Sequence, residues 1–216
     1  MLKLCIFDLD GTTADTIEDL ADAANYALSC KGLPLHTIEE YKYFVGNGIP
    51  KLISRACGSD DTALNNELLD LFNYYYSRHY VDKTKPYNGI INVLDSLKDM
   101  NVGVAVYSNK ADEYVGVILD KLFPGIRFAW YTGKRDGYPL KPDVTLMLEL
   151  LKRDGIKPHE CLYIGDSNVD IQTAKNAGMV SCGVLWGFRT KQELADAGAD
   201  HLADKPEDII ALVRKL

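Results

Sequence analysis

The sequence predicts an α/β protein with a Rossmann-like parallel sheet as its core and an inserted helical cap domain. Three observations favour this fold. An apolar run of five residues within residues 2–7 breaks abruptly into carboxylates, residues 13–85 follow helical periodicity without a good strand run, and helical and strand-like segments alternate strictly after Pro86. Such alternation is typical of a parallel sheet covered by helices on both faces. The predicted domains are a core of residues 1–13 and 85–216 and a cap of residues 14–84.

The first strand ends in Asp8-Leu-Asp10-Gly11-Thr12. Residues two apart in an extended chain lie on the same side, so Asp8 and Asp10 are expected to point the same way, and Gly11 allows a sharp turn. At about 4 Å and an effective dielectric of about 20, their repulsion is on the order of 4 kcal/mol, so a cation is expected nearby. An ordinary solvated turn is the plainer interpretation, but ligands of α/β sheets bind beside the carboxyl ends of the strands.

The insertion after the first strand predicts four helices. Ile17, Leu20, Ala24 and Leu28 follow helical spacing up to a stop at Gly32. Three more helical patterns occupy residues 37–45, 47–57 and 60–80. Together they predict a small helical bundle over the site.

The remainder of the chain predicts the other strands and helices of the core. Strands are expected where short apolar runs lie between polar turns, and helices where the apolar residues recur every three or four positions. The predicted strands are residues 102–107, 128–131, 161–164 and 180–185 and a short strand around residue 201. The predicted helices are residues 90–100, 111–122, 144–154, 169–177, 192–197 and 206–214.

Composition limits the classes of function. The chain has 216 residues, 47% of them hydrophobic, and a formal net charge of −7. That charge disfavours a partner such as nucleic acid or an anionic membrane, because both attract basic surfaces. The five cysteines include no Cys-x-x-Cys pair, which favours free thiols in a reducing cytoplasm, and no apolar run approaches the roughly 18 residues of a membrane span. A cytoplasmic monomer or small homo-oligomer is expected.

Polar clusters follow the ends of two further strands. Ser108-Asn109 comes after the strand at 102–107, Asp166 follows the strand at 161–164 with Asp170 beyond it, and Lys141 precedes a helix. Each feature alone is explained by a helix cap or a surface lysine. Because parallel strands end at the same edge of the sheet, the set predicts one site with several carboxylates, a hydroxyl and a lysine. That combination suits phosphoryl transfer through an aspartyl-phosphate.

Each residue type has a role in such chemistry. Asp8 would be the nucleophile and Asp10 the group that gives a proton to the leaving alkoxide and later takes one from water. The Ser108 hydroxyl and adjacent backbone N–H groups would hold the transferring oxygens, and Lys141 would offset negative charge. Asn109, next to Ser108, is a further candidate catalytic residue. Several acidic residues facing a phosphate monoester require a divalent cation with oxygen ligands, and Mg²⁺ fits. The predicted ligands are Asp8, Asp10, Asp166 and Asp170.

These motifs resemble a known family over essentially the full chain. Asp8-Leu-Asp-Gly-Thr, Tyr-Ser108-Asn-Lys, Lys141-Pro and Gly-Asp166-Ser-x-x-Asp-Ile are similar to the four motifs of the haloacid dehalogenase superfamily. Later residues, including Trp186-Gly187, resemble its phosphoglycolate phosphatase branch. The resemblance implies magnesium dependence, a strand order of 5-4-1-2-3 and a mobile helical cap.

The cap contains one candidate substrate-binding segment. Gly46-Asn47-Gly48 precedes a helix that carries Lys51 and Arg55, four residues apart and therefore on one face. The glycines would admit a ligand to the N–H groups of the helix N-terminus, and Arg55 or Lys51 would bind a carboxylate. A flexible loop followed by a solvated basic face is the alternative.

The expected function is a Mg²⁺-dependent phosphatase of a small phosphorylated metabolite, with 2-phosphoglycolate as the first candidate. A sugar phosphomutase of the β-phosphoglucomutase type is the nearest alternative, although Thr12, a predicted substrate-binding residue, resembles the phosphatases. A catalytically silent regulatory or binding module is the alternative from another class. The presence of every candidate catalytic residue argues against it.

Overall fold

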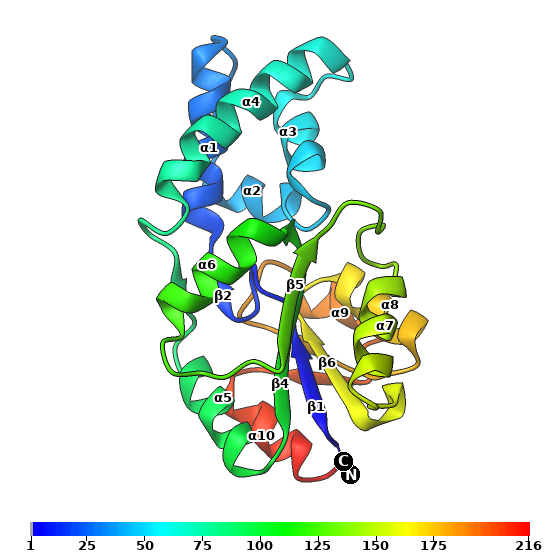
Figure 1. Cartoon of the computed structure of the whole chain (residues 1–216). Coiled ribbons are helices and arrows are strands. Elements are labelled where there is room, and N and C mark those ends of the chain that lie inside the picture. Colours follow the sequence, from blue (N-terminus) through cyan, green and yellow to red (C-terminus); the bar gives the residue numbers. More distant parts are fainter. Residues whose placement is uncertain (1) are drawn as a thin grey trace. The chain divides into compact units, whose positions relative to one another are not determined.

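The computed structural model describes residues 2–216, which form two compact units (Figure 1). The helical unit is Asp15–Lys85, and the core unit comprises the residues up to Ala14 together with Pro86–Leu216. The chain passes between the units twice. At these crossings β2 (Ala14–Asp15) and β3 (Lys85–Pro86) pair as a two-stranded sheet.

The core unit is built on a six-stranded parallel sheet with the order β5-β4-β1-β6-β7-β8. Numbered along the chain within this sheet, its first five strands have the order 3-2-1-4-5. This is the predicted order seen from the opposite edge, and β8 adds a sixth strand. The bounds are β1 (Leu4–Phe7), β4 (Gly103–Ala111), β5 (Trp130–Lys134), β6 (Cys161–Gly165), β7 (Val180–Val184) and β8 (His201–Ala203).

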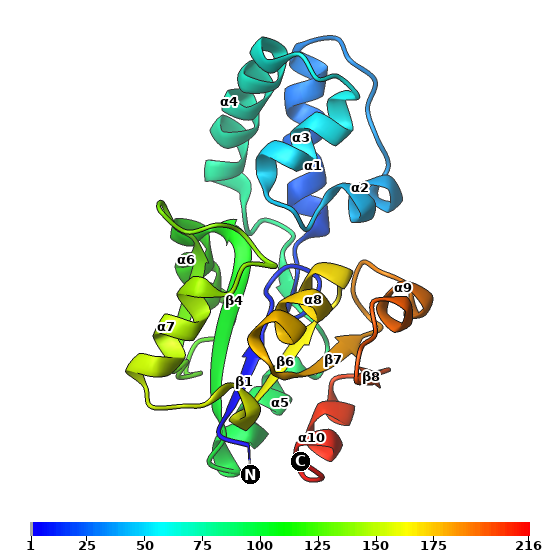
Figure 2. The same ribbon diagram turned by 90° about the vertical axis from the view of Figure 1, so that its right-hand side faces the viewer.

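Helices cover both faces of this sheet, as the alternating pattern predicted (Figures 1 and 2). Residues of α7 (Thr145–Arg153) and α8 (Asn168–Ala177) share one hydrophobic cluster with Leu4 and Ile6 of β1. The opposite face carries α5 (Ile90–Asp99), α6 (Asp112–Leu122) and α10 (Glu207–Val213). All four residues of β1 are buried, which explains why this strand is continuously apolar and does not alternate. The remaining helices are η1 (Pro158–Glu160) and α9 (Lys191–Asp196).

The helical unit contains α1 (Ile17–Cys30), α2 (Ile38–Phe44), α3 (Ile49–Cys57) and α4 (Thr62–His79). Helices α1 and α4 pack against each other, and the buried stripe of α4 is Leu68, Phe72 and Tyr76. All four predicted helices are present, with ends that differ by one or two residues. Among the described residues, no helix is long and apolar enough to cross a membrane.

Two predicted strands are displaced. The strand expected at residues 102–107 continues to Ala111, because β4 extends beyond its partner β1 and, after a change of register past Tyr107, pairs Ala111 with Lys134 of β5. β5 lies later than predicted: Trp130–Thr132 pair with Ala105–Tyr107 of β4, and Lys134 pairs with Ala111 beyond the change of register. Residues 108–110 therefore lie within a strand and do not follow its end.

Candidate active site

The turn after β1 is tightly hydrogen-bonded. The carbonyl oxygen of Leu9 accepts hydrogen bonds from three successive backbone N–H groups: Thr12 at 3.3 Å, Thr13 at 3.1 Å and Ala14 at 3.0 Å. Gly11 has a φ of +83°, and a Cβ at this position would lie 2.3 Å from Oδ2 of Asp166. Glycine is therefore required twice, for the left-handed backbone and for the close approach to Asp166.

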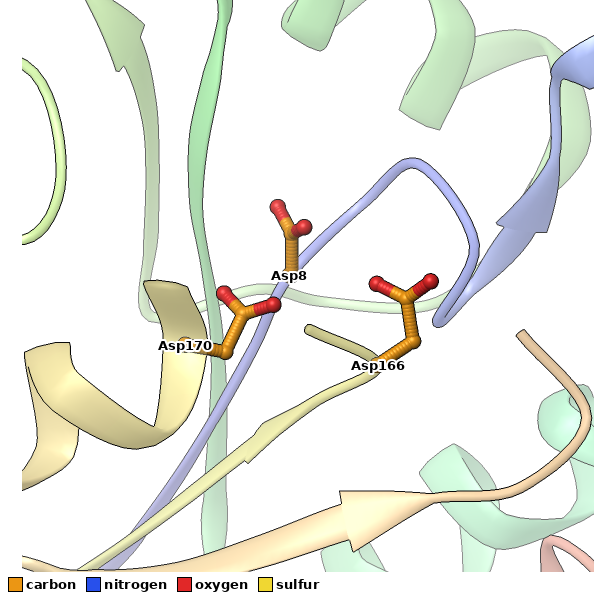
Figure 3. A group of neighbouring side chains, drawn as sticks. All are labelled: Asp8, Asp166 and Asp170. Atoms are coloured by element: carbon orange, nitrogen blue, oxygen red, sulfur yellow. The ribbon is translucent and has the colours of Figure 1, made fainter. Parts of the chain in front are cut away.

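Three buried carboxylates meet at this edge of the sheet (Figure 3). Asp8 follows β1, Asp166 follows β6 and Asp170 lies in the first turn of α8. Each offers one oxygen, and these oxygens all lie within 4.8 Å of one another. Within residues 2–216, this is the one group of His, Cys, Asp or Glu side chains with such a spacing.

Lys141 joins two of these carboxylates. Its Nζ lies 2.9 Å from Oδ1 of Asp8, 2.8 Å from Oδ1 of Asp170 and 3.3 Å from the carbonyl oxygen of Tyr107. Three partners match the three donors of an ammonium group. Asn109 holds the backbone of the same lysine, because its Oδ1 accepts from the Lys141 N–H at 2.7 Å and its Nδ2 donates to the Lys141 carbonyl oxygen at 3.4 Å.

Asp170 and Asp166 are also held by neighbouring protein groups. Oδ2 of Asp170 accepts hydrogen bonds from the Ser167 hydroxyl at 2.6 Å and from its N–H at 3.1 Å. Oδ1 of Asp170 also accepts from the Tyr163 hydroxyl at 3.4 Å. Oδ2 of Asp166 accepts from the Phe188 N–H at 2.7 Å. These contacts fix the orientation of both carboxylates.

The charges here do not balance, because three buried carboxylates lie together and the Lys141 ammonium group contacts two of them. Burial raises the pKa of Asp8 to about 7 against the opposing effect of Lys141, and Asp170 and Asp10 add to the rise. Burial likewise raises the pKa of Asp166 well above its usual range, with Asp170 and Asp8 adding to it. Burial opposes the charged form of Lys141, but the carboxylates of Asp170 and Asp8 raise its pKa well above the ordinary value. The surplus of carboxylate oxygens fits a hard divalent cation such as Mg²⁺.

Asp10 is a predicted metal ligand, and that role stays a prediction. Its carboxylate is not part of the three-carboxylate group and instead accepts from Nζ of Lys110, with Oδ1 at 3.0 Å and Oδ2 at 3.3 Å. The Lys110 side chain is 1% exposed. Sequence reasoning gave this lysine no role. The available signal was its place directly after Ser108-Asn109, in a strand that runs on past β1.

The two predicted hydroxyl groups are buried. Ser108 is 4% exposed, and its Oγ accepts from the Lys110 N–H at 3.3 Å. Thr12 is fully buried, and its carbonyl oxygen accepts from Nε1 of Trp186 at 3.0 Å. Its own hydroxyl has no hydrogen-bond partner among the described residues. Both hydroxyls thus lie in the two segments that carry Asp8 and Lys110.

The predicted cap residues form contacts within the helical unit. Arg55 donates to the carbonyl oxygens of Phe44 at 2.9 Å and Tyr43 at 3.3 Å, and to Oδ1 of Asn47 at 2.8 Å. Gly46 and Gly48, on either side of Asn47, both have positive φ values. Lys51 is exposed. Arg55 therefore stabilises the loop before α3, and its role toward a substrate stays a prediction.

Comparison with known proteins identifies the class to which this site belongs. The haloacid dehalogenase-like hydrolase family matches residues 5–184, so the chain belongs to that family. Phosphoglycolate phosphatase from Pseudomonas savastanoi pv. phaseolicola is 32% identical over 219 residues, covering 99% of this chain and 78% of that protein. Phosphoglycolate phosphatase from Vibrio parahaemolyticus is 31% identical, covering 98% of this chain and 96% of that protein. A crystal structure of a candidate phosphoglycolate phosphatase from Lactobacillus delbrueckii subsp. bulgaricus has a TM-score of 0.91 and 35% identity, with 98% of each chain covered.

Proposed function

We propose that this protein is a Mg²⁺-dependent phosphatase that hydrolyses a small phosphorylated metabolite through an aspartyl-phosphate, with 2-phosphoglycolate as the first candidate substrate. The observation that carries the proposal is the Asp8 carboxylate, held by Lys141 within a buried group of three carboxylates at the end of the central strand. Membership of a hydrolase family and the phosphoglycolate phosphatases among its relatives support it.

The proposed reaction has two steps. An Asp8 oxygen attacks the phosphorus, and the bond from phosphorus to the ester oxygen breaks while Asp10 gives that oxygen a proton. The alcohol leaves. Asp10, now a carboxylate, then takes a proton from water as the water oxygen attacks the phosphorus of the aspartyl-phosphate. Inorganic phosphate leaves, and Asp8 is a free carboxylate again.

The neighbouring residues have supporting roles in this proposal. Ser108 and nearby backbone N–H groups would bind the transferring oxygens, and Lys141 would offset the charge of Asp8 and the phosphoryl group. Asp8 and Asp166, with Asp170 beside them, would hold Mg²⁺. The cation would supply the positive charge needed where these carboxylates face a dianionic phosphate ester. Asn109 keeps Lys141 in place through its backbone.

The experiment is a phosphate-release assay on a panel of phosphorylated metabolites, with Mg²⁺ and with EDTA. The panel includes 2-phosphoglycolate, p-nitrophenyl phosphate and β-glucose 1-phosphate, the last with a separate assay for glucose 6-phosphate to detect a mutase. We expect phosphate release that EDTA abolishes and Mg²⁺ restores. The Asp8→Asn variant should fold and release none, because an amide is not a nucleophile. Full activity without a divalent cation, or a phosphorylated Asp8→Asn protein, would refute the proposal.

A further inference from the structure

We infer that Lys110 is a positioning residue that holds the Asp10 carboxylate in the orientation needed for proton transfer. The inference rests on the proposed function, because it assigns Asp10 the exchange of a proton with the leaving oxygen. Both oxygens of Asp10 lie within 3.3 Å of the Lys110 ammonium group. The lysine side chain is 1% exposed and that of Asp10 is 14% exposed, so the pair is largely shielded from water.

The pair separates Asp10 from the neighbouring carboxylates. Asp10 is close enough to Asp8 that its charge contributes to the raised pKa of Asp8, yet its carboxylate lies outside the group that Asp8 forms with Asp166 and Asp170. Lys141 contacts Asp8 and Asp170, whereas Lys110 contacts Asp10. The two lysines thus pair with different carboxylates, and the ion pair with Lys110 holds the Asp10 carboxylate away from the other three.

The fold delivers Lys110 to this place through the extension of β4. The strand passes β1 and changes register after Tyr107, and the Lys110 N–H bonds back to Oγ of Ser108 at 3.3 Å. A lysine so deeply buried needs a partner for its charge, since an unpaired buried charge is strongly unfavourable. A solvated surface lysine, the usual interpretation of such a residue, would be free to rotate. This one is held.

Leaving-group dependence tests the inference. Departure of an alkyl oxygen needs the proton from Asp10, whereas p-nitrophenolate leaves readily without one. We expect Asp10→Asn and Lys110→Gln both to lower kcat/KM, which reports the steps up to departure of the leaving group, by about 10²- to 10⁴-fold on an alkyl phosphate and far less on p-nitrophenyl phosphate. Lys110→Arg, which keeps the charge, should restore most of the alkyl rate. Equal losses on the two esters in Lys110→Gln would overturn the inference.

Two controls isolate the pair. Lys134→Met removes a lysine from the exposed neighbouring segment of β5 and should leave both rates unchanged. Mg²⁺ binding measured by calorimetry should change by less than about tenfold in Lys110→Gln. A larger change of affinity in either direction would show that Lys110 also affects the metal site and contradict its assignment to Asp10.

A double-variant cycle remains decisive if Lys110→Gln alone does not fold. Asp10→Asn removes the charge that Lys110→Gln would leave buried without a partner, so the double variant should fold. If Lys110 acts through Asp10, the double variant should have the same alkyl rate as Asp10→Asn. A further loss would show an independent role and overturn the inference. Absence of phosphate release by the wild-type protein would instead refute the proposed function, before any variant is compared.

Discussion

Gly187 shows how strongly a single residue can constrain the group of three carboxylates. A Cβ at this position would lie 2.2 Å from Cβ of Asp166 and 2.4 Å from the carbonyl oxygen of Gly11. Its neighbours bind the same two segments, because Trp186 donates to Thr12 and the Phe188 N–H donates to Asp166. The loop after β7 therefore packs directly against both the turn after β1 and the end of β6. Gly187 has no room for a side chain larger than a hydrogen atom between Gly11 and Asp166.

We expect Gly187→Ala to displace Asp166 and to weaken Mg²⁺ binding at least about tenfold. Overpacking of this kind also costs about 1–3 kcal/mol of unfolding free energy. Mg²⁺ titration calorimetry and urea unfolding measure the two effects. Gly116→Ala is the matched control, because the three atoms nearest to its Cβ would all belong to the Tyr131 side chain, at 3.1 Å or more. An unchanged Mg²⁺ affinity in Gly187→Ala would show that Asp166 adjusts without consequence.

The candidate site could be predicted where the chemistry directly follows an apolar run of the sequence. Asp8, Ser108 and Asp166 come at or beside the ends of apolar runs, and a parallel sheet brings such ends to one edge. Lys110 and Gly187 could not be assigned, because each acts on a residue far away in the sequence. Spacing along one segment carries no information on which remote side chain it meets.

At the scale of elements, Ser167 connects the stability of α8 to the site. It is the N-cap of the helix, its Oγ accepts from the Asp170 N–H, and its hydroxyl donates to the Asp170 carboxylate. Thr190 forms a similar capping box with Glu193 at α9. One box contains a member of the acidic group, whereas the other is exposed.

We therefore expect Ser167→Ala and Thr190→Ala each to lower the unfolding free energy by about 0.5–2 kcal/mol, since each removes a helix cap. Only Ser167→Ala should lower kcat, because only there does the lost hydroxyl orient a carboxylate that contacts Lys141. Chemical unfolding and steady-state kinetics on the same preparations give both quantities. Equal kcat values in the two variants would mean that the remaining contacts suffice to hold Asp170.

Arg55 requires a test that separates stability from recognition. Loss of its hydrogen bonds to Phe44 and Asn47 should destabilise the helical unit, at about 1.5–3 kcal/mol for a hydrogen bond from a charged group. If Arg55 also binds a substrate carboxylate, Arg55→Ala should lower kcat/KM more for 2-phosphoglycolate than for p-nitrophenyl phosphate. Lys51→Ala, which removes an exposed cation from the same helix, is the control. A uniform loss on the two esters would restrict Arg55 to supporting the loop.

The elements themselves were largely predictable, and their ends were less so. Helices followed the apolar period, and their ends differ by a residue or two because caps and last turns have little signal. The predicted end of β4, at residue 107, was wrong for a physical reason. Polar residues 108–110 are typical of a turn, but pairing with β5 keeps the chain extended through Ala111. Tertiary contacts overrode the local pattern there.

For the whole molecule, the buried carboxylates predict an unusual pH dependence of stability without metal. The pKa of Asp8 is about 7 in the folded protein against an ordinary 3.8, so between these values the folded protein keeps a proton that the unfolded chain has released. Stability in EDTA should therefore fall as the pH rises from about 4 to about 7. Asp166 acts in the same direction.

The measurement is the urea midpoint at pH 5 and pH 7 in EDTA, for the wild type and Asp8→Asn. The variant should lose less stability than the wild type between the two pH values, because it lacks the titrating group. Mg²⁺ should restore more stability at pH 7 than at pH 5, since it binds the ionised carboxylates. Identical pH dependence in the two proteins would contradict the raised pKa.

The central place of β1 has a consequence for the order in which a growing chain folds. Its two neighbours in the sheet, β4 and β6, begin at Gly103 and Cys161, so the strand that precedes Asp8 leaves the ribosome long before either partner exists. The helical unit is one continuous segment that is complete at Lys85, so all of its internal contacts can form before β4 and β6 are made. During synthesis we therefore expect the helical unit to fold first, while β1 is still without its neighbours in the sheet. The group of three carboxylates should assemble only after most of the protein has been made.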